Sequence, residues 1–407
     1  MKLESIDNVM KRKISTNTNL LLMINTIRKI IDIFLGPFLT SYLFKTAIEN
    51  IKIISIYNIL SYVTIAIISL IIGKILKNKY QMDIFRIGMI SKFVQLAILI
   101  ILGNNVINYI WVLAIISGFS TETWSFPLNL FSSELILNEE KKNFVVYKTI
   151  LNNLVKILVP FILGTVINAK SFEVTAVIIF ILSIIQILLS LKIQFRMENN
   201  SQSKKLNLKK EIDNIRNNSK LKRFYKMKFF KGMAYEGALD TAVTLLIIMS
   251  FNSDFSLGII TSIISILTML SSYLYKKVKT KEKINLLIFS SCIIIFISSI
   301  MLLFVTNGYT IIIYNLIFGF FLQFIMIAEE VETLKFTNSS VINNTNRVET
   351  YVILEMFLNA GRIISYVLLF IVGMYNSLYL LNLLIILLII SVWVEIINLI
   401  KFNKCEE

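Results

Sequence analysis

The chain has 407 residues, of which 56% are hydrophobic, and carries 41 Lys and Arg against 25 Asp and Glu, a formal net charge of +16. An average soluble domain contains roughly 45–50% apolar residues, so a single water-soluble core would not bury this much apolar surface. Histidine is absent, which removes several catalytic options. The composition therefore excludes an ordinary soluble domain and indicates a membrane protein.

About twelve apolar stretches follow one another, each long enough to cross a bilayer core of about 30 Å. Because a spanning segment must satisfy its own backbone hydrogen bonds, each stretch is predicted to be a helix. The first contains Arg28, Lys29 and Asp32 and lacks a small-residue cleavage site, so we interpret it as an uncleaved span. The predicted spans are 20–44, 51–72, 84–102, 106–126, 144–167, 174–193, 229–251, 255–275, 284–305, 309–328, 351–372 and 378–400.

Lysine and arginine are concentrated in alternate loops. They precede the first span and follow the second, fourth and eighth, whereas the loops of opposite parity hold little beyond Lys45, Lys52 and Lys170. Basic residues beside a span resist translocation, so we expect both termini and the basic loops in the cytoplasm. Topology thus accounts for the charge, and no nucleic-acid partner is expected. With Cys292 inside the ninth span and Cys405 in the cytoplasmic tail, no disulfide between them is expected on this topology.

A polar segment rich in Lys, Arg, Asn and Ser divides the spans into two sets. We predict an N-terminal six-helix bundle over 1–194, a cytoplasmic basic linker over 195–228 and a C-terminal six-helix bundle over 229–407. Apolar residues recur at helical spacing over 208–215 within the linker. Two interpretations stay open there: a short amphipathic helix on the anionic inner leaflet, or a solvated loop that only sets the topology.

Polar positions of the two sets coincide, which indicates an internal repeat. Three positions of the fourth span recur in the tenth at one constant offset, and two of the fifth span recur in the eleventh at a second offset. The matched pairs are Gly118 with Gly319, Glu122 with Gln323, Asn129 with Glu330, Asn152 with Asn359 and Lys148 with Glu355.

In this arrangement the chain resembles the major facilitator superfamily, whose members have two six-helix bundles, a long basic central loop and cytoplasmic termini. Gly118, Pro127, Ser133 and Glu134, followed by the charged run 139–142, look like that family's fourth helix and the loop after it. The resemblance implies an all-α membrane protein of about twelve transmembrane helices in two pseudo-symmetric bundles.

The loop after the second span departs from that family's pattern. Gly73, Lys74 and Lys79 stand where the family has a signature of glycine, aspartate and basic residues, but Lys77 replaces the aspartate and Tyr80 the second glycine. The charge-relay role of this loop is therefore not carried over.

The fifth span resembles part of the proline and glycine signature of the family's antiporters. Pro160 and Gly164 match it, whereas Val159 and Leu163 stand where further glycines are expected. On this resemblance we favour export over uptake.

Ionisable residues inside the spans mark the candidate pathway. A charge at bilayer depth costs at least about 2.5–3.5 kcal/mol on insertion scales, so it usually faces a partner or a wet cavity. Spans one, four, seven and ten each carry a polar stripe at helical spacing, and the same helices line the central cavity in the family that the chain resembles. The pathway candidates are Lys29, Asp32, Glu122, Trp124, Asn129, Lys148, Asn152, Lys156, Glu236, Asp240, Gln323, Glu355, Asn359 and Arg362.

The alternative is that the polar stripes only bridge helices by hydrogen bonds or ion pairs. In that case Lys29 and Lys231 would extend towards an interface with water. Arg28 lies beside the stripe of the first span and is placed to pair with Asp32, one turn further on.

Charges of opposite sign occupy equivalent positions in the fifth and eleventh spans. We expect Glu355 to neutralise Arg362 or a cation across the cavity. Lys148 or Lys156 is expected to meet an acidic group of the substrate or Asp32. Trp124 is a candidate because its ring could stack on an organic substrate.

The interpretation that fits best is a secondary transporter that moves a small organic solute across the cytoplasmic membrane by alternating access. We expect proton coupling through Asp32 and Glu122, because a carboxyl group shielded from water can load and release a proton. No phosphate-binding Gly-x-x-x-x-Gly-Lys-Ser/Thr sequence is present, so an ion or substrate gradient should supply the energy. The alternatives are an uptake symporter and a flippase for a lipid-linked substrate.

A membrane-embedded enzyme is the rival class. Glu329, Glu330 and Glu332 superficially resemble the paired glutamates of an intramembrane protease family, but that family also needs histidines. A channel or scaffold would not explain the paired polar stripes. We therefore expect no enzyme activity, no cofactor and no metal, and a monomer whose partners are its substrate, protons and membrane lipids. The abundance of Ile, Asn and Lys indicates an AT-rich genome and a bacterial source.

Overall fold

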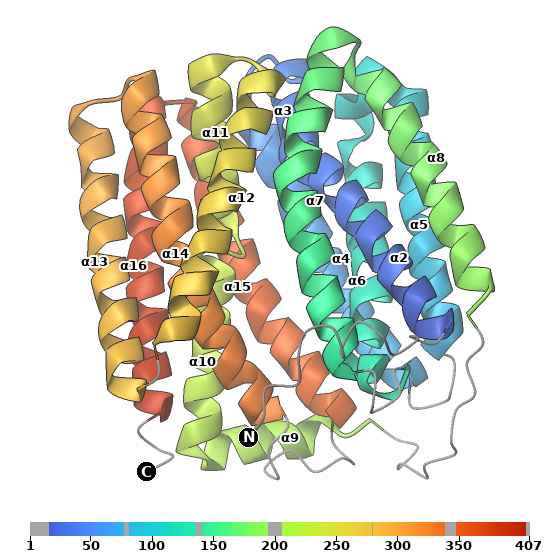
Figure 1. Ribbon diagram of the computed structural model, residues 1–407, viewed down its shortest axis with the longest axis vertical. Helices are drawn as coiled ribbons and strands as arrows, with labels where there is room; N and C mark the ends of the chain where they lie inside the picture. The colour runs from blue at the N-terminus through green and yellow to red at the C-terminus, as the bar shows by residue number, and fades with distance from the viewer. Residues whose placement is uncertain are drawn as a thin grey trace.

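The computed structural model describes residues 16–76, 81–135, 141–193, 206–278, 280–337 and 347–403. These ranges are helical and contain no strand. Most helices run up and down the molecule, and those before the central linker stand beside those after it (Figure 1).

The N-terminal half starts with a continuous helical run whose pitch widens in the middle. It consists of α2 (Thr16–Ile33), the π-helical turn η1 (Phe34–Phe38) and α3 (Leu39–Thr46). Pro37 lies inside η1 and has no amide hydrogen to donate to the preceding turn, which favours the wider turn. The rest of this half comprises α4 (Ile51–Leu76), α5 (Gln81–Leu102), the 3-10 turn η2 (Gly103–Tyr109), α6 (Ile110–Leu135), α7 (Lys141–Ala169) and α8 (Phe172–Leu191).

The C-terminal half is entered through a short helix that lies across one end of the molecule, α9 (Leu208–Asn217) (Figure 1). Asn207 and Asn218 cap α9 and the following helix by accepting hydrogen bonds from main-chain amides. The helices after α9 are α10 (Ser219–Met233), α11 (Ala238–Phe251), α12 (Asp254–Lys277), α13 (Lys281–Phe304), α14 (Gly308–Thr337), α15 (Arg347–Tyr375) and α16 (Leu378–Asn403).

Ten helical segments in the described parts of the chain are long and apolar enough to cross a membrane. One of them, 81–129, contains α5 and most of α6. The run α2–η1–α3 is not among the ten, and α2 carries Arg28, Lys29 and Asp32, but it packs beside α7 and α8 within the bundle. The predicted all-α membrane fold in two bundles is thus confirmed.

The seventh span differs from its prediction as one stretch over 229–251. It begins at Ser219, inside the segment that we assigned to the linker, and its helix is interrupted between α10 and α11. Backbone outside a helix is tolerated in a membrane only where the protein supplies partners. Here the amide of Ala238 donates to Ser365 Oγ at 3.0 Å. A Cβ on Gly237 would lie 2.2 Å from the carbonyl oxygen of Gly232, so the break requires glycine.

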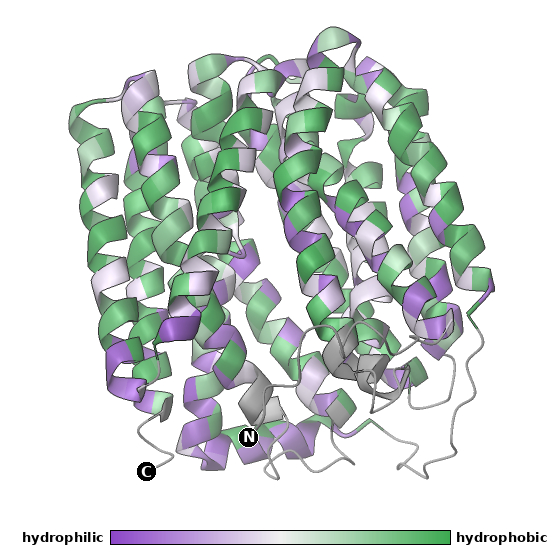
Figure 2. Ribbon diagram, in the orientation of Figure 1, coloured by the Kyte–Doolittle hydropathy of each residue, from purple (hydrophilic) through white to green (hydrophobic). Residues whose placement is uncertain are grey.

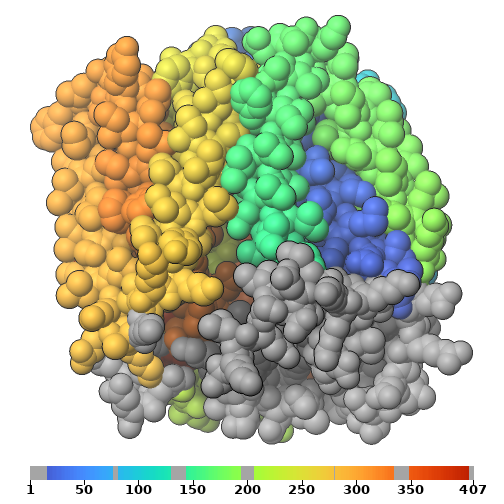
Figure 3. Space-filling view, in the orientation of Figure 1, coloured from blue at the N-terminus to red at the C-terminus, as the bar shows by residue number. Residues whose placement is uncertain are grey.

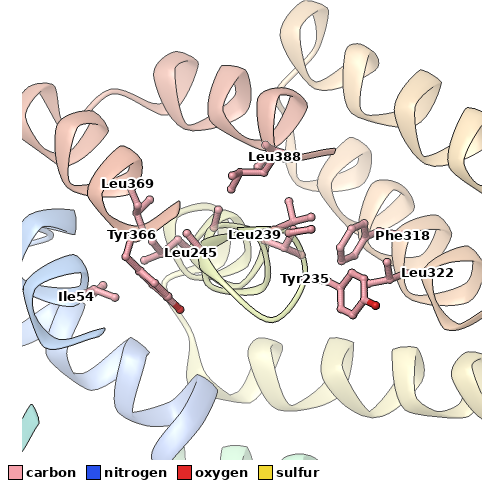
Figure 4. Packing of buried hydrophobic residues seen from close by; sticks show 14 of the residues in the cluster. Ile54, Tyr235, Leu239, Leu245, Phe318, Leu322, Tyr366, Leu369 and Leu388 are labelled. Carbon is pink, nitrogen blue, oxygen red and sulfur yellow. The ribbon is translucent and has the colours of Figure 1, made fainter. Parts of the chain in front are cut away.

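The half-helix α11 occupies the middle of the C-terminal half. Figure 4 shows it viewed end-on, with side chains of α14, α15 and α16 around it and Ile54 of α4 on the side of the other half. Leu239 and Leu245 are fully buried, and they share one core with Phe318, Tyr366 and the surrounding helices. This packing holds Asp240, near the start of α11, at a defined place between the halves.

The two halves touch along two pairs of helices. The contact between α4 and α15 extends over their length, from Lys52 beside Gly373 to Gly73 beside Val352. In the contact between α7 and α12, Gly164 and Gly258 let the two backbones approach closely, since a Cβ on Gly258 would lie 2.4 Å from the carbonyl oxygen of Pro160. Towards the end that carries α9, the surface between α7 and α12 is hollowed, and the brown-red atoms of α15 are visible behind it (Figure 3).

Polarity distinguishes the two ends of the molecule. Hydrophobic residues dominate the middle of the helices, and hydrophilic residues gather at the end formed by α9 and the adjacent helix ends (Figure 2). Lys209, Lys210 and Arg216 of α9 are exposed there, while Leu208 and Ile215 pack against the core. The segment 208–217 is thus a helix, but Leu208 and Ile215 pack against the protein, and its contact with the inner leaflet stays a prediction.

The predicted orientation is tested with single cysteines at the two ends. In a variant in which Cys292 and Cys405 are replaced by serine, Lys210→Cys in α9 should react with a membrane-impermeant maleimide only after the cells are permeabilised, because basic segments stay in the cytoplasm. Lys170→Cys, in the loop after α7, should react in intact cells and serves as the matched control. The opposite labelling pattern would reverse the topology.

Candidate substrate and proton pathway

A cavity of about 250 Å³ lies between the halves and is lined by both. The N-terminal half contributes Asp32 from α2, Tyr62 from α4 and Lys92 from α5, and the C-terminal half contributes Asp240 from α11 and Tyr366 from α15. Gly36 and Pro37 of the π-helical turn also line it, which places the irregular part of the first span at the cavity wall. We call this space the upper cavity.

Asp32 is held in the upper cavity by the expected ion pair. Arg28 Nε donates to both carboxylate oxygens of Asp32, at 3.0 and 3.2 Å, so the predicted pairing is confirmed. The guanidinium group lies over the ring of Trp124, 5.1 Å from its centroid, and that ring stacks on Phe85. Trp124 is therefore buried behind Arg28 and orients the ion pair, and it does not line the cavity.

Lys92 is a member of the upper cavity that the sequence analysis missed. Its side chain is 3% exposed, and Nζ donates to Gln95 Oε1 at 2.9 Å. Gln95 Nε2 donates to the hydroxyl of Tyr57, which donates to Ser117 Oγ at 2.9 Å. The sequence contained the information needed to find it, because Lys92 is the charged residue in the middle of the third apolar stretch.

A second cavity, of about 370 Å³, adjoins the first at Asp240 and opens beside α7 and α12. We call it the lateral cavity. Lys29 from α2, Lys156 from α7 and Gln323 from α14 contribute polar groups to it. Among the residues that the structure describes, no carboxylate lies within ion-pair distance of either lysine. Gln323 Nε2 donates to Ser272 Oγ at 3.2 Å.

A third cavity, of about 360 Å³, lies closer to α9 and is surrounded mainly by the C-terminal half. Asn129 of α6 reaches it from the other half, and Glu330 and Glu355 line it from α14 and α15. Glu236, at the break between α10 and α11, joins them. The charged residues near this break form a connected set of ion pairs, which we call the hinge network: Lys228, Lys231, Glu236, Glu329 and Arg362.

The hinge network ties two helices, α14 and α15, to the broken seventh span. Lys228 and Lys231 of α10 both donate to the carboxylate of Glu329 in α14, the second at 2.8 Å. Lys231 also pairs with Glu236 at 2.9 Å. Glu236 in turn accepts from Arg362 Nη2 of α15. Charge pairing of this kind compensates for the cost of burying these groups at membrane depth.

The expected pair between Arg362 and Glu355 is corrected by this geometry. Arg362 Nη2 binds Glu236, and Nη1 donates to Asn359 Oδ1 at 2.9 Å. Asn359 Nδ2 donates to Glu355 Oε2 at 3.3 Å, so Glu355 is connected to the arginine through an amide. The sequence repeat aligned Glu355 with Lys148 of the fifth span, but it did not involve Glu236. The break in the seventh span turns Glu236 towards α15. The guanidinium group also lies over the Tyr62 ring of α4, 5.1 Å from its centroid.

The remaining candidates lie outside the three cavities. Glu122 is 1% exposed and accepts a hydrogen bond of 2.7 Å from Ser69, which links α6 to α4. Lys148 and Asn152 lie on the same face of α7 as Lys156, closer to the start of that helix, and are half-buried. The structure thus brings Lys29, Asp32, Lys156 and Asp240 to connected cavities and keeps Glu122 behind them.

At the end away from α9, an ion pair joins the halves. Asp254, at the start of α12, accepts from Lys45 Nζ at 2.7 Å and from Ser41 Oγ at 2.6 Å, both in α3. Close by, a Cβ on Gly164 would lie 2.6 Å from the carbonyl oxygen of Asp254. This end of the interface is therefore closed by side-chain and backbone contacts together.

Comparison with known proteins supports the fold. No family model matches the chain. It is 22% identical over 331 residues, 81% of this chain and 76% of the relative, to the uncharacterized protein YqgE of Bacillus subtilis (strain 168). The chain also superposes on solved structures of membrane transporters.

Three of these structures cover almost the whole chain. The nucleoside transporter NupG matches 96% of this chain and 100% of its own with a TM-score of 0.67 and 13% identity. A bacterial homologue of the iron transporter ferroportin in the inward-facing state matches 98% and 99% with a TM-score of 0.63 and 11% identity. A bacterial metal transporter matches 96% and 100% with a TM-score of 0.63 and 10% identity. The chain therefore shares the fold of these transporter structures.

The hinge network generates a prediction on stability. Glu236→Gln should lower the free energy of unfolding by roughly 2 kcal/mol, less than the about 3–5 kcal/mol of a fully enclosed pair, because the Glu236 side chain is 27% exposed. Adding Arg362→Gln should recover part of that loss, since the unpaired guanidinium is removed. Thermal unfolding of the purified protein in detergent measures both.

The matched control for this pair is Glu355→Gln, which removes a carboxylate that binds Arg362 only through Asn359. Its destabilisation should be smaller, and Arg362→Gln should not rescue it. A double variant at Glu236 and Arg362 no more stable than the worse single variant would reject the pair.

Proposed function

We propose that the chain is a secondary transporter of the major facilitator superfamily that carries a small organic solute through the upper and lateral cavities. The observation that supports this most is that both cavities are lined by the N-terminal and C-terminal halves together and hold ionisable groups. A site at the interface of two related bundles is where a transporter that rocks one bundle against the other exposes its substrate alternately to the two sides.

The contacts between the halves fit one state of such a cycle. The end with Lys45 and Asp254 is closed, whereas the groove between α7 and α12 is hollow towards α9 (Figure 3). With α9 in the cytoplasm, this is an inward-facing arrangement. We infer from the charge distribution that both termini lie in the cytoplasm of a bacterial cell and that the protein resides in its cytoplasmic membrane.

Protons are the proposed coupling ion, with Asp32 and Glu122 as the groups that carry them. Asp32 faces the upper cavity, where Arg28 can release it when the carboxylate is protonated. Glu122 has no cationic partner in the described parts of the chain and accepts one hydrogen bond from Ser69, so a bound proton would remove its desolvation cost. Export is the favoured direction, on the resemblance of the Pro160 and Gly164 segment to antiporters.

The coupling proposal is tested in proteoliposomes with a pH-sensitive dye inside, screened against a panel of organic solutes. A transported solute should drive proton movement in the parent protein. Asp32→Asn and Glu122→Gln should each abolish gradient-driven transport while leaving solute exchange, because only the coupled step needs a carboxyl group that exchanges a proton. Glu282→Gln, at the start of α13 and outside the cavities, is the control. Undiminished uphill transport in both variants would remove the two residues from the mechanism.

A further inference from the structure

The two halves differ in whether the cations inside them have carboxylate partners. In the C-terminal half, Lys228, Lys231 and Arg362 each pair with a carboxylate. In the N-terminal half, Lys29 and Lys156 face the lateral cavity with no such partner among the described residues. Since an unpaired charge at membrane depth is costly, these two ammonium groups are kept for something other than the stability of the bundle.

The charge balance of the lateral cavity indicates the sign of the charge that a ligand bound there would carry. Lys29 and Lys156 repel each other across it. Asp240, in the lining, attracts Lys29, and Glu330, which lines the third cavity, attracts Lys156 from outside. The lining itself holds two lysines and one carboxylate, an excess of one positive charge. A monoanionic group between the two lysines would balance it.

The rest of the lining indicates the shape of the ligand. The half-helix α11 and α14 contribute five apolar side chains to the lining, alongside the polar Thr244, Asn315 and Gln323. The apolar residues are Val243, Ile247, Phe318, Leu322 and Met326. A ligand that fills the cavity would place an apolar body against these side chains, where its burial contributes roughly 25 cal/mol per Å² of surface removed from water.

We propose that the lateral cavity binds an amphipathic organic anion, with its acid group between Lys29 and Lys156 and its apolar body against α11 and α14. This names the substrate class of the transport site and rests on the proposed function only in treating the cavity as part of that site. The hollow between α7 and α12 faces the side of the bundle (Figure 3). The same chemistry therefore fits both a soluble carboxylate and the headgroup of an anionic lipid.

The charge of the cavity is measured with a cysteine in its wall. Ser265→Cys, on α12 and in the lining, is placed in a background without Cys292 and Cys405. In inside-out vesicles it is reacted with sulfonatoethyl and with trimethylammonioethyl methanethiosulfonate, and each rate is divided by the rate with a free thiol. The anionic reagent should be favoured about tenfold.

Lys29→Gln and Lys156→Gln should each lower that ratio severalfold, and Lys170→Gln, at the far end of α7, should leave it unchanged. A ratio of one or below in the parent variant would overturn the proposal. So would a ratio that the two cavity lysines do not influence.

Ligand binding is measured by protection of the same cysteine. We expect 4-phenylbutyrate, but not 4-phenylbutylamine, to slow labelling severalfold, and Lys156→Gln to abolish the protection. Protection in vesicles that contain phosphatidylglycerol, compared with phosphatidylcholine alone and without added solute, would identify a lipid as the source of the anion. Equal protection by the amine, or none by any anion, rejects the site. The assay requires no transport, so protection without transport would preserve this inference and reject the proposed function.

Discussion

The cost of an unpaired charge in the bilayer is the constraint that organises this molecule. The C-terminal half meets it with the hinge network, in which Glu236 and Glu329 each bind two cations. The N-terminal half meets it in part with the pair of Arg28 and Asp32, and otherwise by placing its lysines on cavities between the halves. Lys92 there donates to Gln95, whereas Lys29 and Lys156 are the two for which we propose an anionic ligand.

The break in the seventh span connects this electrostatic arrangement to movement. Interrupting the helix at Gly237 turns Glu236 towards Arg362, while α11 carries Asp240 into both cavities between the halves. Arg362 also contacts the Tyr62 ring of the opposite half. A change in the protonation or occupancy of the cavities would therefore act on Asp240 and Glu236, which lie next to the break at Gly237. A break in a helix absorbs rotation more readily than a continuous helix does.

Sequence reasoning predicted the fold because apolar runs of spanning length and alternating basic loops are local properties. It also selected Lys29, Asp32, Lys156 and Asp240, which line the cavities between the halves, since a charge in an apolar run is visible without a structure. It did not predict that Glu236 binds Arg362, because the break at Gly237 depends on Ser365 from a distant helix. Lys92 was not predicted although its charge is equally visible, because its helix, α5, carries no polar stripe that repeats in the other half.

The central claim is that the halves rock about the cavities, so that the two ends of the α7 and α12 interface open in alternation. Pulsed electron spin resonance between labels at Val146 in α7 and Leu270 in α12 reports the end near α9, and labels at Asn168 in α7 and Ser250 in α11 report the opposite end. We predict two populations at each end, with the longer distance at one end accompanying the shorter distance at the other, and a shift between them when Lys45→Gln removes the ion pair to Asp254. A single distribution at both ends, unchanged by Lys45→Gln and by pH, would contradict alternating access in this protein.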